Sequence, residues 1–151
     1  MSEAKTASFP FRTEVRVRLP ETDAMGIVFH GNYFTYFEVG RVDYLRNLGL
    51  TLGVRPIKDF ENVVAAAHID FKSPSRLDDP LTIDVRIKAI GGSSFTFEFE
   101  IRHRQQNRLV ARGYTTHVAV DDDLKPMRVP DEFRKTIADF EGWESAETRP
   151  G

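Results

Sequence analysis

The feature that most constrains the fold is a change of hydrophobic period partway along the chain. From Tyr33 to Leu48, apolar side chains recur at mostly three- and four-residue spacings, the repeat of one face of an α-helix. These side chains are Phe34, Phe37, Tyr44, Leu45 and Leu48. Asn32 is a favoured N-cap residue and Gly49 a favoured residue just past a helix end, so both boundaries are marked. We expect one buried helix, about 24 Å long at roughly 1.5 Å per residue.

Most of the remaining chain alternates with a period of two, the repeat of half-buried β-strands. The expected strands are Phe11 to Leu19, Val63 to Phe71, Leu81 to Ala89, Phe95 to Ile101 and Leu109 to Val120. Turns at 91–92 and 105–107 separate the last three, and we expect the four strands after the helix to form an antiparallel meander. In the last strand, we expect Val110, Tyr114 and Val118 to share one face.

A short helix from Asp131 to Phe140 is expected because Pro130 precedes it, and the tail after Gly142 is expected to fray. One helix cannot cover both faces of a five-stranded sheet, so the natural arrangement is a sheet that curls around the long helix. The fold class is therefore α+β. The 151 residues are expected to form a single domain with an ordered core from about residue 9 to residue 140.

The composition excludes several kinds of site and partner. The chain has no cysteine, which excludes disulfides, thiolate metal sites and cysteine nucleophiles. A net charge of -2 and a pI near 6.1 give no sign of a basic surface for nucleic acid. The N-terminal residues lack the apolar stretch of a signal peptide, and no apolar run is long enough to span a bilayer. We expect a cytoplasmic protein without nucleic-acid or membrane partners.

The chemistry is expected between Pro20 and Arg41, where a carboxylate precedes the start of the long helix. Asp23 lies in a loop in which Gly26 and Gly31 permit tight turns and bring backbone N–H groups near a ligand. The first N–H groups of a helix are unpaired and carry positive dipole character, so a carbonyl oxygen docked there is polarised. A nearby carboxylate can attack the carbonyl carbon or deprotonate a water that does. Thioesters suit this apparatus because a thiol with a pKa of about 8.5 leaves without a strong acid.

This segment resembles the signature of the 4-hydroxybenzoyl-CoA thioesterase family, most closely its YbgC-like acyl-CoA thioesterase branch. The family commonly reads D-x-x-G-[IV]-V-[YFW]-[HY]-x-x-Y, followed by a helix with E-x-x-R. The matching residues here are Asp23, Gly26, Ile27, Val28, Phe29, His30, Tyr33, Glu38 and Arg41. Weaker similarity continues through the strands, so the resemblance covers roughly Phe11 to Phe133.

The resemblance implies a hotdog fold and hydrolysis of an aryl- or short- to medium-chain acyl-CoA to the free acid and CoA. It implies that Asp23 is the nucleophile or general base and that the backbone N–H of His30 polarises the thioester carbonyl. Gly26, which shapes the loop between them, is grouped with these catalytic residues. The resemblance also implies dimers with active sites between subunits, often paired into tetramers. No cofactor or metal is implied, because CoA is part of the substrate.

The substrate-binding residues are expected on the helix and on the strands around it. The acyl group is expected to contact Phe29, Tyr33, Phe37 and Glu38. Some relatives carry basic residues at the turn before the Phe-rich strand, but here the turn from Ala89 to Ser94 has none. Hydroxyl and backbone N–H groups at Ser93 and Ser94 are still able to hold a CoA phosphate. The other expected CoA contacts are Lys72, Ser73 and Arg76.

Several of these residues also have simpler interpretations. Asp23 taken alone is typical of a loop residue that accepts hydrogen bonds from its own backbone. Glu38 lies near the position of a helix nucleophile in a second hotdog lineage, but a buried ion pair with Arg41 explains both residues and is favoured. The acidic triplet 121–123 is expected to be a solvated turn, because a calcium loop starting there would place Pro126 where glycine is required.

Alternative functions stay open at this point. A non-catalytic acyl-CoA-binding protein of the same fold is one, since fold does not fix function. A hotdog dehydratase is less favoured, because the Pro-Gly-rich segment expected around its histidine is absent around His30. His68, His103 and His117 show no metal-ligand spacing, so no metal site is expected. The sequence leaves open the acyl group, the choice between CoA and an acyl carrier protein, and the choice between covalent and general-base hydrolysis.

Overall fold

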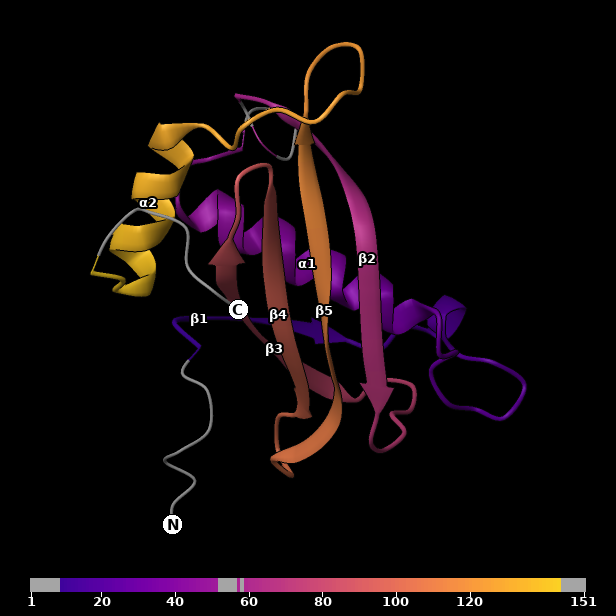
Figure 1. Cartoon of the computed structure of the whole chain (residues 1–151). Helices are drawn as coiled ribbons and strands as arrows, with labels where there is room; N and C mark the ends of the chain where they lie inside the picture. The colour runs from indigo at the N-terminus through magenta and orange to yellow at the C-terminus, as the bar shows by residue number, and fades with distance from the viewer. Residues whose placement is uncertain (1–8, 52–56, 58, 145–151) are drawn as a thin grey trace.

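The structure, a computed structural model, describes residues 9–51, 57 and 59–144 (Figure 1). Its elements are β1 (Phe11–Arg16), α1 (Asn32–Asn47), β2 (Glu61–Phe71), β3 (Pro80–Ile90), β4 (Ser94–His103), β5 (Arg108–Val120) and α2 (Asp131–Glu141). A 3₁₀ turn, Leu19–Glu21, lies between β1 and α1. Neither helix in this part of the chain has the length and apolar character needed to cross a bilayer. Residues 145–151, the end of the tail predicted to fray, lie outside the described residues.

The five strands form one antiparallel sheet in the order β1-β3-β4-β5-β2. The turns predicted at 91–92 and 105–107 join β3, β4 and β5 as successive hairpin partners. The predicted four-strand meander is wrong for β2, which pairs with β5 at the edge of the sheet. A hairpin needs a tight turn, whereas the segment 72–79 is long enough to carry the chain across to β3.

The long helix α1 packs on one face of the sheet against β1, β3 and β4, and passes behind β5 and β2 in the view of Figure 1. The ring of Phe37 stacks on Phe99 with centroids 4.3 Å apart, and Tyr44 meets Phe97 edge-on at 5.6 Å. Gly40 permits this close approach, because a Cβ there would lie 2.8 Å from a methyl group of β3. The predicted α+β class and the five-stranded sheet around a long helix are confirmed.

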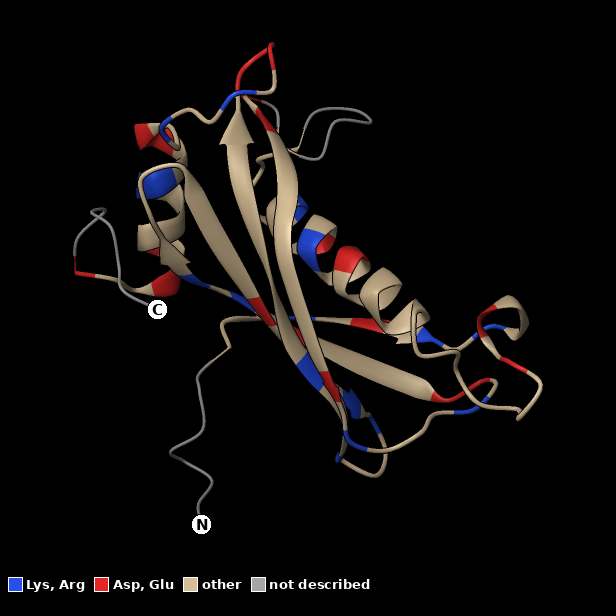
Figure 2. Ribbon diagram, turned by 45° about the vertical axis from the view of Figure 1, so that its right-hand side comes forward, with Lys and Arg blue, Asp and Glu red and all other residues tan. Residues whose placement is uncertain are grey.

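The other face of the sheet carries charged side chains in cross-strand pairs, which stabilise neighbouring strands. Arg12 of β1 binds Asp84 of β3 at 2.6 Å, and Arg86 of β3 binds Glu98 of β4 at 2.6 Å. Figure 2 shows basic and acidic residues interspersed over strands, helices and loops. The apolar core therefore lies on the α1 side of the sheet.

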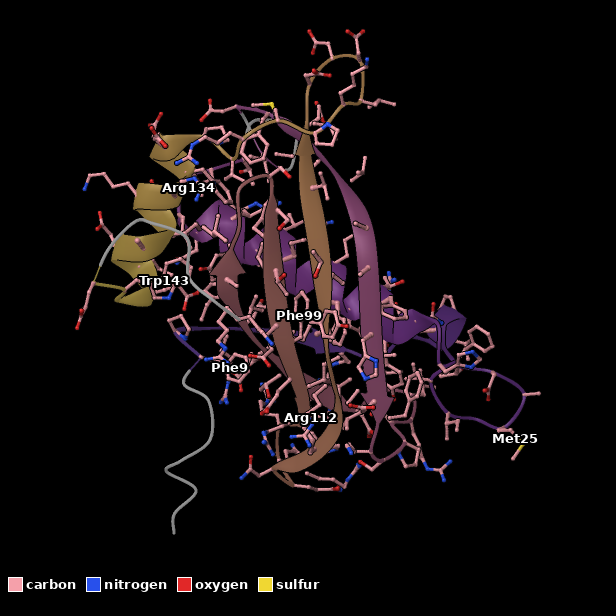
Figure 3. The ribbon with its side chains drawn as sticks, viewed as in Figure 1. Phe9, Met25, Phe99, Arg112, Arg134 and Trp143 are labelled. Carbon is pink, nitrogen blue, oxygen red and sulfur yellow. The ribbon has the colours of Figure 1, made fainter. Side chains whose placement is uncertain are left out.

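The second helix, α2, packs beside β3 and closes one end of the core. Glu141 accepts a hydrogen bond from the Tyr44 hydroxyl at 2.5 Å, which ties α2 to α1. Arg134, which is buried on α2 (Figure 3), donates to the carbonyl groups of Gly91 and Gly92 at 2.6 and 2.9 Å. α2 thereby fixes the turn between β3 and β4. The helix predicted here is confirmed and is one residue longer than expected.

The two element boundaries on either side of the loop before α1 differ from the sequence prediction. The first strand ends at Arg16, three residues early, because a 3₁₀ turn that contains Pro20 begins at Leu19. The long helix begins at Asn32, so Asn32 is not its N-cap, and the side-chain amide donates to the carbonyl of Glu21 at 2.9 Å. Gly49 follows the helix with a φ of +71°, as predicted for a residue just past a helix end.

The predicted face of the last strand is also wrong. A β-bulge lies near Val110, where the pairing between β4 and β5 shifts by one residue. Val110 and Ala111 are both buried, whereas Tyr114 lies on the more exposed face, opposite Glu98. A shift of one residue reverses the two faces of a strand, so Val110 and Tyr114 do not share one.

Candidate active site

The loop from 21 to 31 forms a narrow hairpin between the 3₁₀ turn and α1. An isolated bridge between Thr22 and Val28 closes its neck. Gly26 lies at the tip with a φ of +79°, a conformation that a side chain would strain. Figure 3 shows Met25 at the far end of the loop, which projects away from the sheet. Gly26 is thus needed for the shape of this loop, as its position in the sequence motif predicts.

Asp23 follows the neck of this loop, and its side chain is half-buried. Its backbone N–H donates to the carbonyl of Ile27 at 2.8 Å, and its carbonyl accepts from the N–H of Gly26 at 2.9 Å. Its Oδ1 accepts a hydrogen bond from the N–H of Met25 at 2.8 Å, as expected for a loop aspartate that binds its own backbone. Oδ2 has no donor among the described residues, so one carboxylate oxygen is available to a substrate or a water.

The start of α1 offers two unpaired backbone donors. Within the described part of the chain, no group accepts a hydrogen bond from the backbone N–H of His30 or of Gly31. Their neighbours are paired: the N–H of Phe29 donates to the carbonyl of Glu21, and the N–H of Asn32 donates to the carbonyl of Phe29. Two adjacent free N–H groups at a helix start are able to bind an anion or a polarised carbonyl oxygen.

A cavity of about 310 Å³ opens beside His30, within the size range of ligand pockets. Its lining residues are Ile27, Val28, His30, Tyr33, Phe71, Lys72, Ser73 and Pro74. The exposed ring of His30 lies 4.4 Å from that of Phe29 and 6.0 Å from that of Phe71 on β2. The end of β2 therefore brings Lys72 and Ser73, two of the predicted CoA contacts, next to the motif. Asp23 is not one of the lining residues.

Tyr33 lines this cavity, and its hydroxyl is turned into the interior. It is buried and has no hydrogen-bond partner of acceptable geometry among the described residues, and the same is true of the Ser75 hydroxyl. Burial raises the pKa of Tyr33, so the phenol keeps its proton at neutral pH. A buried donor without a partner is costly unless a ligand or water satisfies it. Tyr33 therefore lines the cavity as the sequence predicts, while its hydroxyl lies in the interior beside Ser75.

Glu21, which the sequence did not single out as a functional residue, is almost fully buried behind the loop. Its Oε1 accepts hydrogen bonds from the N–H of Arg18 at 2.9 Å and from the hydroxyl of Tyr36 at 2.8 Å, and its Oε2 accepts from Arg18 Nε at 2.7 Å. Burial alone would raise the pKa of Glu21, but these hydrogen bonds and the Arg18 charge outweigh it and lower the pKa. The carbonyl of Glu21 also binds Phe29 and Asn32, so this residue positions both ends of the loop.

We expect Glu21→Gln to destabilise the protein by about 1–3 kcal/mol, because an amide N–H₂ would face the Arg18 donors in a buried site. The folded-state pKa of Glu21 lies below its usual value of 4.5, so its stabilising effect is complete above that pH. The effect is lost as the pH falls through the folded-state pKa. Urea unfolding of parent and variant at pH 7 and at pH 3 measures this difference. A gap that stays constant or widens at pH 3 would contradict the role of the carboxylate.

The remaining predicted residues lie in different places. Arg76 pairs with Ile27 in an isolated bridge and lies beside Gly26, so it belongs to the loop end of the site. Phe37 and Glu38 do not line the cavity beside His30; they line a second cavity further along α1.

The predicted phosphate contacts Ser93 and Ser94 lie at the other end of the sheet. Ser94 pairs with Val118 of β5, whose partner on β2 is Val63. From there β2 runs eight residues to the cavity beside His30, a distance of about 26 Å at roughly 3.3 Å per residue. A single chain therefore does not bring these serines to that cavity.

The predicted ion pair between Glu38 and Arg41 is present, with a 3.4 Å separation between Arg41 Nη2 and Glu38 Oε2. It is not a buried pair, because the Glu38 side chain is 64% exposed whereas that of Arg41 is 13% exposed. Glu38 is therefore free to leave Arg41 at little cost, since exposed ion pairs are worth about 1 kcal/mol or less.

A five-stranded antiparallel sheet around a long helix, with free N–H groups and a carboxylate near the helix start, defines a hotdog-fold thioesterase. The Thioesterase-like superfamily matches residues 17–137, and the chain belongs to this family. The family resemblance and the hotdog fold predicted from the sequence are confirmed, and the chain is an enzyme of the thioester hydrolase class.

Individual relatives agree with this assignment. The chain is 32% identical over 130 residues to the acyl-CoA thioesterase YbgC of Haemophilus influenzae, covering 84% of this chain and 90% of that protein. It superposes on the 1,4-dihydroxy-2-naphthoyl-CoA thioesterase Slr0204 from Synechocystis with a TM-score of 0.78 and 26% identity, over 85% and 96% of the two chains. A thioesterase from Thermus thermophilus, complexed with coenzyme A and Zn, also gives a TM-score of 0.78 with 26% identity, over 94% and 98%.

Proposed function

We propose that this protein hydrolyses an aryl- or short- to medium-chain acyl-CoA to the free acid and CoA. The observation that carries the proposal is the pair of free backbone N–H groups of His30 and Gly31, beside a largely apolar cavity that also contains Lys72. These donors would hold the thioester carbonyl oxygen and stabilise the negative charge that develops on it. We place the activity in the cytoplasm, in keeping with a chain that has no cysteine.

Asp23 supplies the reacting carboxylate in this proposal, and two routes use the same oxygen. In the first, Oδ2 takes a proton from a water whose oxygen attacks the carbonyl carbon; the carbonyl electron pair moves to oxygen and then expels the CoA thiolate. In the second, Oδ2 attacks the carbon directly, the thiolate leaves, and water hydrolyses the resulting anhydride. Met25 orients the carboxylate in both routes by its hydrogen bond to Oδ1.

Lys72 and Arg76 are the groups that we assign to the CoA phosphates. Lys72 lines the cavity beside His30, and Arg76 lies next to Gly26 at the loop. Both cations lie on the segment that leaves β2, so a phosphate held there would place the thioester near the start of α1. Ser73 has a different role, because its hydroxyl already binds the carbonyl of Leu109 and the guanidinium of Arg108.

The proposal includes self-association as a dimer or a tetramer. β2 is an edge strand, and Val64 and Phe71 on it are 59% and 50% exposed. An exposed apolar edge strand is a template for pairing with another chain. Within one chain, the turn at Ser93 and Ser94 does not reach the cavity beside His30. In a dimer, the turn of one copy would be able to reach the cavity of the other.

The experiment that tests the proposal is release of free thiol from a panel of acetyl-, octanoyl-, palmitoyl- and benzoyl-CoA, with an octanoyl acyl carrier protein as a further substrate. We expect at least one CoA thioester to give a kcat/KM of about 10⁴ M⁻¹ s⁻¹ or more. The same thioesters without protein give the background rate. Absence of release from every thioester, with the protein folded, would overturn the hydrolase proposal.

A second candidate, an acyl-CoA-binding protein without catalysis, is favoured by one observation: Asp23 does not line the cavity beside His30. Calorimetric titration with octanoyl-CoA separates the two functions. Tight binding with no thiol release supports the binding protein, whereas binding accompanied by release supports the thioesterase.

A further inference from the structure

A second cavity, of about 260 Å³, lies further along the same side of α1. Phe34 and Phe37 of α1 form one wall, and Val64 and Ala67 of β2 form another. It shares no lining residue with the cavity beside His30. Both cavities lie between α1 and β2, whose far end carries Phe71 of the first cavity, so the second cavity follows the first along α1. The second cavity is therefore placed to take the part of a substrate that extends away from the reacting carbonyl.

The second cavity contains a cation that is poorly paired. The side chain of Arg41 is only 13% exposed, and a guanidinium has five N–H donors. Its one partner among the described residues is Glu38, at 3.4 Å and 64% exposed. Burial lowers the pKa of Arg41, but a guanidinium stays protonated at neutral pH. A buried charge with one long, exposed partner is a favourable site for an anion.

Besides Arg41 and its partner Glu38, the polar side chains that line this cavity are those of Thr115 and His117, and neither is cationic. His117 is buried, and burial together with the Arg41 charge lowers its pKa to about 3, so the ring is neutral at pH 7. Its two ring nitrogens are occupied by Asn62 Oδ1 at 2.8 Å and by the Thr115 hydroxyl at 2.9 Å. Arg41 is therefore the group in this cavity that is able to bind an anionic ligand.

The spacing along α1 relates this cation to the reacting carbonyl. Side chains on a helix lean toward its N-terminus, so the Arg41 guanidinium lies level with Glu38, which it contacts. From His30 to Glu38 there are eight residues, or about 12 Å along the axis. The wall between these points is formed by the aromatic rings of Tyr33, Phe34 and Phe37, which suits a methylene chain.

We propose that Arg41 binds a carboxylate at the far end of the acyl chain, so that the favoured substrates are CoA thioesters of medium-chain dicarboxylic acids. This inference rests on the thioesterase function proposed above and names its substrate class. Arg41 is a specificity residue in this proposal and does not touch the reacting atoms.

The test compares suberoyl-CoA with octanoyl-CoA, two eight-carbon thioesters that end in a carboxylate and in a methyl group. We expect the parent to have the higher kcat/KM for suberoyl-CoA. In Arg41→Met, which keeps the length of the side chain and removes its charge, the suberoyl-to-octanoyl ratio of kcat/KM should fall by about 10- to 100-fold. Arg41→Lys keeps the positive charge but lacks the planar guanidinium, which binds a carboxylate through two N–H groups. It should give an intermediate ratio. Arg46→Met is the matched control, because Arg46 lies on α1 but outside the cavity and should leave the ratio unchanged.

Two readouts keep this inference separate from the proposed function. Hydrolysis of octanoyl-CoA by the parent reports on the thioesterase activity, whereas the ratio reports on Arg41. If the parent hydrolyses neither thioester, calorimetric binding of the same pair to parent and Arg41→Met tests the preference directly. A parent that does not favour suberoyl-CoA overturns the inference. The inference is also overturned if Arg41→Met loses kcat/KM equally on both thioesters and light scattering shows a changed oligomeric state. That outcome would make Arg41 an interface residue.

Discussion

Asp23→Asn is expected to lower kcat for CoA release by about 10³-fold, within the range for loss of a general base. Asparagine has nearly the same shape as aspartate, and its side-chain oxygen is still able to accept the hydrogen bond that Met25 donates to Oδ1. The loop should therefore keep its conformation, while Oδ2 is replaced by a group that neither takes a proton nor attacks a carbonyl. Thiol release measures the loss in turnover, and calorimetry should show acyl-CoA binding unchanged within about threefold.

The matched control is Asp122→Asn, the same chemical change at an exposed residue of the loop after β5. It should leave both kcat and binding unchanged. Equal activity of Asp23→Asn and the parent would show that Asp23 is not the catalyst. In that case Glu38, whose carboxylate is largely exposed, becomes the next residue to replace.

Gly113→Ala is expected to destabilise the protein by about 3 kcal/mol or more, the upper range for overpacking. A Cβ on Gly113 would lie 2.0 Å from the carbonyl oxygen of His68 on β2. Both groups belong to backbone in a paired ladder, so no flexible side chain is able to move aside. β2 would have to shift away from β5, and Phe71 and Val64 would move with it. Urea unfolding at pH 7 measures the change in the free energy of unfolding.

Gly92→Ala serves as the control for this substitution. Nothing lies within 4 Å of a Cβ at Gly92, and its φ is outside the left-handed region. Its free energy of unfolding should stay within about 0.5 kcal/mol of the parent, as for most surface changes. If Gly113→Ala were as stable as Gly92→Ala, β2 would have to pack less closely against β5 than the structure shows.

Local sequence patterns predicted the elements of the fold well, because each pattern depends on one face of one element. The helix around Phe37 and Tyr44 and the hairpins at 91–92 and 105–107 are examples. The place of β2 was not predictable in this way, because its pairing with β5 joins residues 40 to 59 positions apart, such as Val63 and Val118. The face of Tyr114 was mispredicted because the bulge near Val110 arises from the pairing of β4 with β5. It does not change the alternation of apolar and polar residues in the sequence.

The residues of the candidate site were also predicted only in part. Asp23, His30 and Tyr33 lie within eleven residues of one another, so a contiguous motif was enough to group them. Glu21 was missed because a loop carboxylate is usually solvated, and its burial depends on Tyr36 from the far side of the loop. The catalytic role of Asp23 remains a prediction, which Asp23→Asn tests.

The position of β2 has a consequence for regulation. The strand lines both cavities along α1, one through Val64 and the other through Phe71, and it also lies at the edge of the sheet. A molecule that paired with this edge would restrict the same backbone that a bound acyl chain contacts. The two binding events would then be thermodynamically linked, and linkage is reciprocal. If a bound acyl chain changes the affinity for pairing at the edge by some factor, pairing must change the affinity for the acyl chain by the same factor.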